Sequence, residues 1–255
     1  MQNNSSNRER FLNTHFDNIS FDQVTSIIKD HIASRTPGYM VSLNTDIAVW
    51  LEKDEVFRQS YDKATMALID SQPLIKLAKS AGLQVKEKLS GSDLMPRICS
   101  WAAQYGYRFY ILGGMGGVTQ RAAANLCENN HGLRCVGVQS PPYGFQSCKE
   151  KTDTVIQAIN QAQPDILFIC LGSPKSEKFL AEHLEELNVP FSLCVGAAVD
   201  FVAGNVKRAP MWMQNAGFEW LYRFLQEPKR LFKRYFVDSW KLVSIIRRYG
   251  IQGQR

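Results

Sequence analysis

The sequence lacks the patterns that most often mark a metal site. It has six cysteines without a CxxC pair, and it has no acidic DxD pair. Its four histidines are scattered, and no credible Ser/His/Asp set can be assembled from them. Cys170 and Cys194 stand within apolar runs, which predicts buried thiols in a reducing compartment rather than a zinc site. We therefore expect chemistry that uses neither a metal nor a cofactor.

Long apolar runs are missing as well. The opening stretch "MQNNSSNRER" lacks the apolar centre of a signal peptide, and no run approaches the ~20 residues that span a bilayer. These absences predict a cytoplasmic protein, or one bound peripherally to the cytosolic face of a membrane. With 255 residues, of which 45% are hydrophobic and 21% charged, the chain suits one globular domain with an appendage.

Positive charge is concentrated at the end of the chain. The net charge is +6, but from residue 207 onward eleven Lys and Arg face three acids, which leaves the preceding part slightly negative. The segment "GFEWLYRFLQEPKRLFKRYFVDSW" (217–240) mixes these cations with aromatic residues. The pattern fits a membrane or nucleic-acid surface, a protein interface, or aromatic residues that pack on the core.

Strand-like and helical segments alternate between residues 38 and 201. Strands are expected over 38–44, 65–70, 107–114, 133–139, 164–172 and 190–201, and helices over 45–64, 96–106, 118–130, 151–162 and 173–187. Such alternation predicts an α/β fold, with a Rossmann-like, largely parallel sheet and helices on both faces. We divide the chain into an N-terminal segment (1–37), an α/β core (38–210) and a basic, aromatic C-terminal helical appendage (211–255).

Polar residues and glycines at the strand ends are the candidates for a ligand site, because sheets of this kind bind ligands there. They are Asn44, Asp70, Gly113–Gly117, Gly172–Lys175 and Gly196–Asp200. Asp70 could act as a general base or only cap the next turn, and its spacing alone favours the cap. Asn44 is either a turn residue or a substrate donor.

Four loops could also line a cleft. "GGMGGV" (113–118) could bring backbone N–H groups to a phosphate, but Thr119 breaks the dinucleotide-binding pattern, and a tight turn explains the glycines equally well. "LGSPKSEKF" (171–179) opens a helix, with Ser173 as the expected N-cap, and would attract a diphosphate through Lys175 or form an ordinary cap. "SGSD" (90–93), which ends in Asp93, and "SPPYGF" (140–145) are polar loops.

Seven segments taken together resemble one family. They are "LNTDIAVW", "ALIDSQPL", "LSGSDLMPRI", "FYILGGMGGV", "PDILFICLGSPKSEKF", "CVGAAVDFVAGNVKRAP" and "GFEWLYRFLQEPKRLFKRY". In this order and spacing the sequence is similar to the WecG/TagA/CpsF family of bacterial glycosyltransferases. The resemblance implies an inverting, metal-independent transfer of a sugar from a UDP-sugar to a polyprenyl-diphosphate-linked saccharide. The product would enter a bacterial surface polysaccharide or exopolysaccharide.

The resemblance also implies roles for individual residues. Asp70 matches the family's catalytic base, and Ser42 and Asn44 match cleft residues. Three appendage cations match residues that reach the diphosphate, namely Arg223, Arg230 and Lys233. The other substrate-binding candidates are Asp93, Gly113, Gly114, Lys175, Ser176, Glu177, Asp200 and Arg208. Ser71 and Ser176 stand where the family usually has Gly and Gln, so the identity of the sugar is not implied.

With this resemblance, we expect the appendage to contact the cytosolic surface of the inner membrane and the UDP leaving group. An NAD(P)-dependent oxidoreductase and a nucleic-acid-binding module are the alternatives, and a non-catalytic scaffold is a third. The imperfect glycine pattern argues against the first. No nucleic-acid partner is expected, and homo-oligomerisation is left open.

Overall fold

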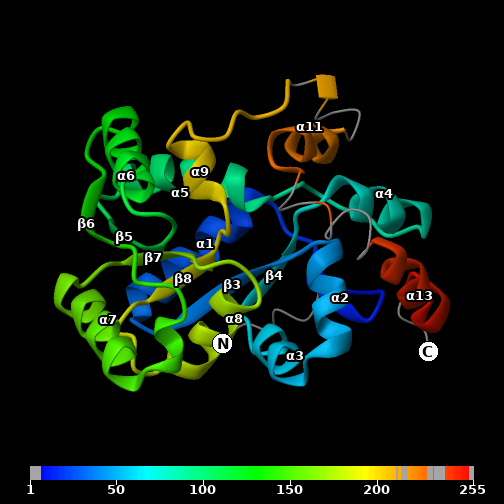
Figure 1. Cartoon of the computed structure of the whole chain (residues 1–255), viewed down its shortest axis with the longest axis horizontal. Helices are drawn as coiled ribbons and strands as arrows, with labels where there is room; N and C mark the ends of the chain where they lie inside the picture. The colour runs from blue at the N-terminus through cyan, green and yellow to red at the C-terminus, as the bar shows by residue number, and fades with distance from the viewer. Residues whose placement is uncertain (1–6, 211, 214–217, 229–231, 233–238, 253–255) are drawn as a thin grey trace.

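The computed structural model describes residues 7–210, 212–213, 218–228, 232 and 239–252. Six parallel strands form its central sheet, in the order β4-β3-β8-β7-β5-β6, which confirms the predicted α/β class (Figure 1). The strands are β3 (Gly38–Leu43), β4 (Met66–Ile69), β5 (Arg108–Gly113), β6 (Arg134–Gln139), β7 (Ile166–Cys170) and β8 (Phe191–Cys194). All residues of β7 and β8 are buried, because helices cover both faces of the sheet.

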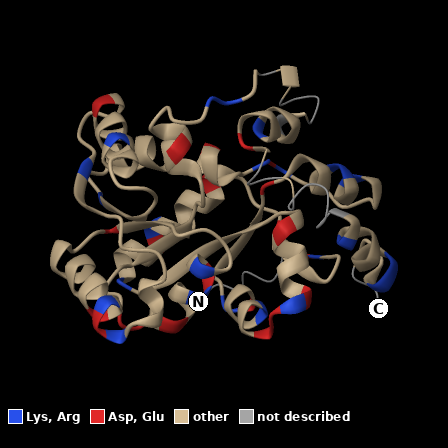
Figure 2. Ribbon diagram, in the orientation of Figure 1, with Lys and Arg blue, Asp and Glu red and all other residues tan. Residues whose placement is uncertain are grey.

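The helices of the α/β part form two layers (Figure 1). One layer contains α1 (Phe21–Ser34), α5 (Gly91–Gln104), α6 (Val118–Asn129) and α9 (Ala198–Val202). The other contains α2 (Thr45–Lys53), α3 (Glu55–Asp62), α7 (Lys149–Ala162) and α8 (Lys175–His183), and α4 (Gln72–Ser80) packs with the same apolar cluster. Each layer buries its own apolar cluster against the sheet. Charged residues lie mainly on the helices and loops, whereas the central strands contain few (Figure 2).

Three local expectations are wrong. The segment 190–201 is not one strand, because β8 ends at Cys194 and the chain turns at Gly196, with φ +56°, into α9. The helix of 45–64 is broken at Asp54, whose extended backbone ends α2 and whose side chain accepts the Phe57 N–H at the start of α3. The "SGSD" segment is the first turn of α5 rather than a loop.

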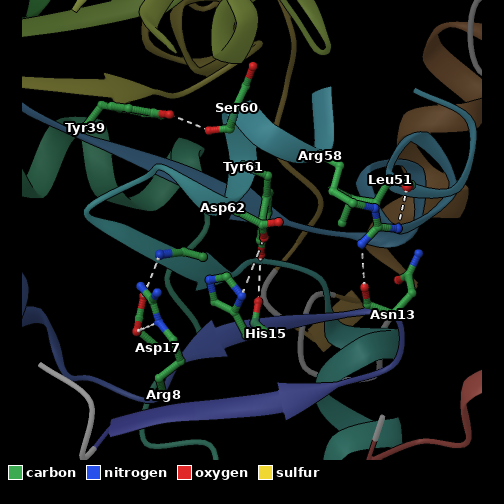
Figure 3. A network of polar contacts seen from close by, with 11 residues as sticks. Arg8, Asn13, His15, Asp17, Tyr39, Leu51, Arg58, Ser60, Tyr61 and Asp62 are labelled. Carbon is green, nitrogen blue, oxygen red and sulfur yellow. Dashed lines mark hydrogen bonds and ion pairs between the residues drawn. The ribbon is translucent and has the colours of Figure 1, made fainter. Parts of the chain in front are cut away.

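The N-terminal residues form a hairpin, β1 (Arg8–Phe11) and β2 (Thr14–Asp17), which packs beside β4. Asp17 accepts hydrogen bonds from the Arg8 guanidinium at 2.9 and 3.1 Å and from the Ala67 N–H at 2.7 Å (Figure 3). Tyr61 donates its hydroxyl hydrogen to the His15 carbonyl at 2.8 Å. These bonds tie the hairpin to β4 and to α3, so the hairpin supports the strand that carries Asp70.

The C-terminal part contains α11 (Glu219–Gln226) and α13 (Ser239–Tyr249). Helix α13 packs against α2 and buries Ile245 in the apolar cluster of that layer. The carbonyl of Ile251 accepts the N–H of Leu12 at 2.9 Å. Among the described helices, none is long and apolar enough to cross a bilayer.

Candidate active site

A cavity of about 920 Å³ opens at the carboxyl ends of β4, β3, β8 and β7. Its wall is built from the segments that follow these four strands, from the start of α5, and from α11 and α13. The residues that line it include Ser42, Asn44, Lys53, Asp70, Ser71, Lys88, Ser176, Glu177, Phe201, Trp220, Arg223 and Leu242. The cavity lies where ligands of open parallel sheets bind, and its size suits a ligand of several hundred daltons.

Asp70 lies directly after β4 and lines this cavity. Its N–H donates to the Leu43 carbonyl at 3.0 Å, so the backbone at the strand end is held in the β3–β4 ladder. The N-cap of the following helix α4 is Ser71, and not Asp70. The side chain is only half-buried, and a carboxylate in this position can reach a hydroxyl group bound in the cavity.

Ser42 and Asn44 reach the same cavity from the end of β3. The Asn44 Oδ1 accepts the N–H groups of Asp46 and Ile47 at 3.0 and 3.1 Å, which makes Asn44 the N-cap of α2. The turn role of Asn44 is therefore confirmed, because its oxygen caps a helix. Contact between its amide nitrogen and a substrate stays a prediction, and Asn44 lines the cavity in which that contact would occur.

Asp93 and Arg208 bind each other at the edge of the cavity. Arg208 Nη1 lies 2.6 Å from Asp93 Oδ1, and Ser90 donates its hydroxyl hydrogen to Asp93 Oδ2. Burial opposes ionisation of Asp93, but the hydrogen bonds from Arg208 and Ser90 outweigh it and hold the pKa of Asp93 below its usual value. Arg208 and Arg223 both lie beside the Phe201 ring, at 5.9 and 5.0 Å from its centre, so two guanidinium groups gather at this side of the cavity.

Glu177 lies in the first turn of α8 and is only 2% exposed, although it lines the cavity. Ser173 is not the N-cap that we expected, because Pro174 occupies that position and the Ser173 hydroxyl donates instead to Glu177 Oε1. Burial raises the pKa of Glu177, against the opposing effect of the Ser173 hydrogen bond. The adjacent Ser176 is equally buried and also lines the cavity.

Four other predicted substrate-binding residues, Gly113, Gly114, Lys175 and Asp200, are not part of the cavity wall. Gly113 and Gly114 have φ values of +103° and +76°, and an added Cβ would meet Cys170 backbone atoms at 2.7 Å and Thr119 Oγ1 at 2.5 Å. Packing thus accounts for both glycines without a ligand. Lys175 Nζ lies 3.5 Å from the centre of the Tyr143 ring, and Asp200 accepts the N–H groups of the next turn through its backbone carbonyl. Arg230 and Lys233 lie outside the described residues.

The sequence analysis did not predict three residues of the cavity wall. Lys53 ends α2, Lys88 precedes α5, and Leu242 lies on α13. A fourth wall residue, Trp220, belongs to the aromatic segment 217–240 and lies on α11. Trp220 and Arg223 lie one helical turn apart on α11, so the same face of that helix supplies both. Within the described residues, no group of His, Cys, Asp and Glu side chains is placed to hold a metal ion.

The fold and the site define this chain as an α/β protein with a large cavity at the carboxyl edge of its sheet. The profile of the glycosyl transferase WecG/TagA/CpsF family matches residues 9–255, and the chain belongs to this family. The protein is therefore a glycosyltransferase, which sets aside the oxidoreductase, nucleic-acid-binding and scaffold alternatives.

Two relatives carry the same name, N-acetylglucosaminyldiphosphoundecaprenol N-acetyl-beta-D-mannosaminyltransferase. The relative from Bacillus subtilis (strain 168) is 23% identical over 244 residues, which cover 95% of this chain and 90% of the relative. The relative from Staphylococcus aureus (strain MW2) is 22% identical over 222 residues, which cover 86% of this chain and 85% of the relative.

Proposed function

We propose that the protein transfers a sugar from a UDP-sugar to a saccharide linked to a polyprenyl diphosphate, with inversion at the anomeric carbon and without a metal. The main support for this proposal is the position of Asp70, whose carboxylate lines the cavity at the carboxyl edge of the sheet. The names of the relatives support a lipid-diphosphate acceptor and an N-acetylated hexosamine as the transferred group.

The reaction is a single displacement. Asp70 accepts the proton of an acceptor hydroxyl, whose oxygen forms a bond to the anomeric carbon. The bond between that carbon and the diphosphate oxygen breaks, and its electron pair leaves with UDP. Because the new bond forms on the face opposite the leaving group, the configuration inverts.

The departing diphosphate needs positive charge around it. Lys53, Lys88 and Arg223 line the cavity, and Arg208 lies beside Phe201 at its edge. Guanidinium groups suit this role, because they form paired hydrogen bonds with phosphate oxygens. We propose that these cations bind UDP, and that Arg230 and Lys233, which lie outside the described residues, add to them.

We also propose that the C-terminal residues hold the enzyme at the cytosolic leaflet of the inner membrane. Trp212, Leu225, Phe232 and Trp240 are 66, 69, 56 and 77% exposed, which is unusual for large apolar side chains. Helices α11 and α13 also supply Trp220, Arg223 and Leu242 to the cavity wall, so Leu225 and Trp240 belong to elements that border the site. A lipid-linked acceptor would then meet the cavity at the membrane surface.

The test of the reaction is the variant Asp70→Asn. It keeps the size of the side chain and removes the base, so we expect transfer to fall by about 10²–10⁴-fold while UDP binding stays unchanged. UDP release would be measured with a panel of UDP-sugars and a polyprenyl-diphosphate-linked N-acetylglucosamine acceptor.

The control variant is Asp153→Asn, which changes an exposed carboxylate that pairs with Lys149 on α7. It should transfer sugar at the wild-type rate. Near-normal turnover by Asp70→Asn would show that Asp70 is only a turn residue, and the proposed mechanism would be wrong.

A further inference from the structure

Glu177 is a buried acid with one oxygen that no protein group satisfies. Its Oε1 accepts the Ser173 hydroxyl, whereas its Oε2 has no hydrogen-bond partner among the described residues. The hydroxyl of Ser176, the preceding residue, likewise lacks a partner within the described part of the chain. Both side chains are 2% exposed and both line the cavity. Since buried polar atoms are rarely left unpaired, these two atoms indicate a place where a ligand completes the bonding.

The surroundings of Glu177 favour an uncharged carboxyl group. None of the described Lys and Arg side chains forms an ion pair with it, and a buried carboxylate without a cation is costly. The charged neighbour is Asp46, from the first turn of α2, whose carboxylate raises the pKa of Glu177 further. The other titratable groups nearby are Tyr39 of β3 and Cys194 of β8, and burial raises the pKa of each, so both are neutral.

A protonated Glu177 would have one defined hydrogen-bond donor. Because Oε1 already accepts the Ser173 hydrogen, the proton would be carried by Oε2, the unsatisfied oxygen. The pair formed by Oε2–H and the Ser176 hydroxyl can therefore donate to a neutral oxygen. It offers no positive charge to a phosphate, and the cations of the cavity come from other segments, namely Lys53, Lys88 and Arg223.

We propose that Glu177 acts as an uncharged hydrogen-bond donor to the donor sugar, and that Ser176 provides the second contact. The ligand atoms are a hydroxyl or an acyl-amide carbonyl oxygen of the sugar ring substituents, and not the diphosphate. This inference rests on the proposed function, because it takes the ligand of the cavity to be a nucleotide sugar. It assigns to Glu177 sugar recognition rather than proton transfer.

Calorimetric titration with UDP, UDP-N-acetylmannosamine and UDP-N-acetylglucosamine tests the assignment on the full chain. In wild type, the affinity for the better UDP-sugar should exceed the affinity for UDP. Glu177→Leu should reduce UDP-sugar affinity by about tenfold and leave UDP affinity unchanged, because it removes one hydrogen bond and leaves its partner unpaired. Glu177→Gln should stay within about threefold of wild type, because the amide N–H₂ replaces the carboxyl donor.

Ser176→Ala is the second variant, and Ser192→Ala is its matched control, since Ser192 is a buried serine of β8 outside the cavity wall. Ser176→Ala should weaken UDP-sugar binding and not UDP binding, and Ser192→Ala should change neither. Thermal unfolding confirms that each variant is folded. If Glu177→Leu does not fold, the assignment is tested by the UDP and UDP-sugar affinities of Glu177→Gln and Ser176→Ala.

Two results would overturn the assignment while leaving the proposed function intact. The first is a Glu177→Gln variant that loses UDP-sugar affinity, which would mean that the anion is required. The second is a folded Glu177→Leu variant that binds UDP-sugar as wild type does. If wild type binds neither UDP nor a UDP-sugar, the proposed function fails, and this inference fails with it.

Discussion

The ion pair between Asp93 and Arg208 joins the first turn of α5 to the segment after α9, and a double-mutant cycle can measure its strength. At 2.6 Å and an effective dielectric constant of about 20, the Coulomb attraction would be roughly 6 kcal/mol before desolvation. The side chains of Asp93 and Arg208 are 27 and 34% exposed, so solvent screening and desolvation offset most of this energy. We expect a coupling free energy of about 1–2 kcal/mol.

The assay is chemical denaturation of wild type, Asp93→Ala, Arg208→Ala and the double variant at one pH and salt concentration. Arg208→Ala should be the more damaging single change, because it also removes the contact with the Phe201 ring and the hydrogen bond to Ser92. The coupling free energy is the change in the free energy of unfolding caused by the double substitution minus the sum of the changes caused by the two single substitutions.

Lys149 and Asp153 provide the control pair. Their separation is 2.7 Å, but Lys149 is 86% exposed and both lie on the surface of α7, so we expect a coupling of about 0.3–0.5 kcal/mol. A coupling for Asp93 and Arg208 no larger than this control value would refute the reasoning. The role of Arg208 would then be confined to the proposed binding of UDP, and Arg208→Ala would lose much of kcat/KM with little loss of stability.

Two further predictions concern the membrane and pH. Replacing both Phe232 and Trp240 by Ala should weaken flotation with anionic vesicles by roughly tenfold, because two large apolar side chains no longer insert into the lipid interface. The control is Tyr143→Ala, which removes a 93% exposed aromatic residue elsewhere on the surface and should float as wild type does. Equal flotation of wild type and both variants would contradict membrane contact through Phe232 and Trp240. Burial, and after it the positive charge of Arg8, hold the pKa of His15 below its ordinary value in the folded protein, so the unfolded chain binds the proton more readily. The free energy of unfolding should therefore decrease as the pH falls through about 6.5. The variant His15→Gln should show a smaller decrease. Urea titrations at a series of pH values measure this, and parallel pH curves for the two proteins would contradict the sign.

Much of the sheet could be predicted because its strands are short apolar runs. Within the predicted strands 65–70 and 164–172, residues 66–69 and 166–171 are all apolar, and the structure buries every residue of the strands formed there. Polar residues that end such runs, Asn44 and Asp70, reach one cavity because parallel strands bring their carboxyl ends to one edge. For Asn44 and Asp70, the position at the end of a strand was therefore sufficient to predict that they line the cavity.

The same local reasoning failed where the apolar pattern does not distinguish a strand from a helix. The run "CVGAAVDF" has no polar interruption before Asp200, so the turn at Gly196 and the short helix α9 were missed. The burial of Glu177 was equally hidden, because it depends on α2, β3 and β8 packing around the start of α8. For Gly113 and Gly114 the sequence left a phosphate loop and a tight turn equally open, and their positive φ values and close packing against Cys170 and Thr119 agree with the tight turn.

Helix α13 has consequences for how the C-terminal residues can be studied. Its Leu242 belongs to the cavity wall, its Ile245 fills the interior beside α2, and Ile251 just beyond it bonds to Leu12 of the hairpin. A chain cut at residue 210 would lose part of the cavity wall and uncover the apolar surface against which Ile245 packs. Loss of lipid binding and loss of catalysis in such a shortened protein would share one cause, so only single substitutions at outward-facing positions can tell anchoring from turnover.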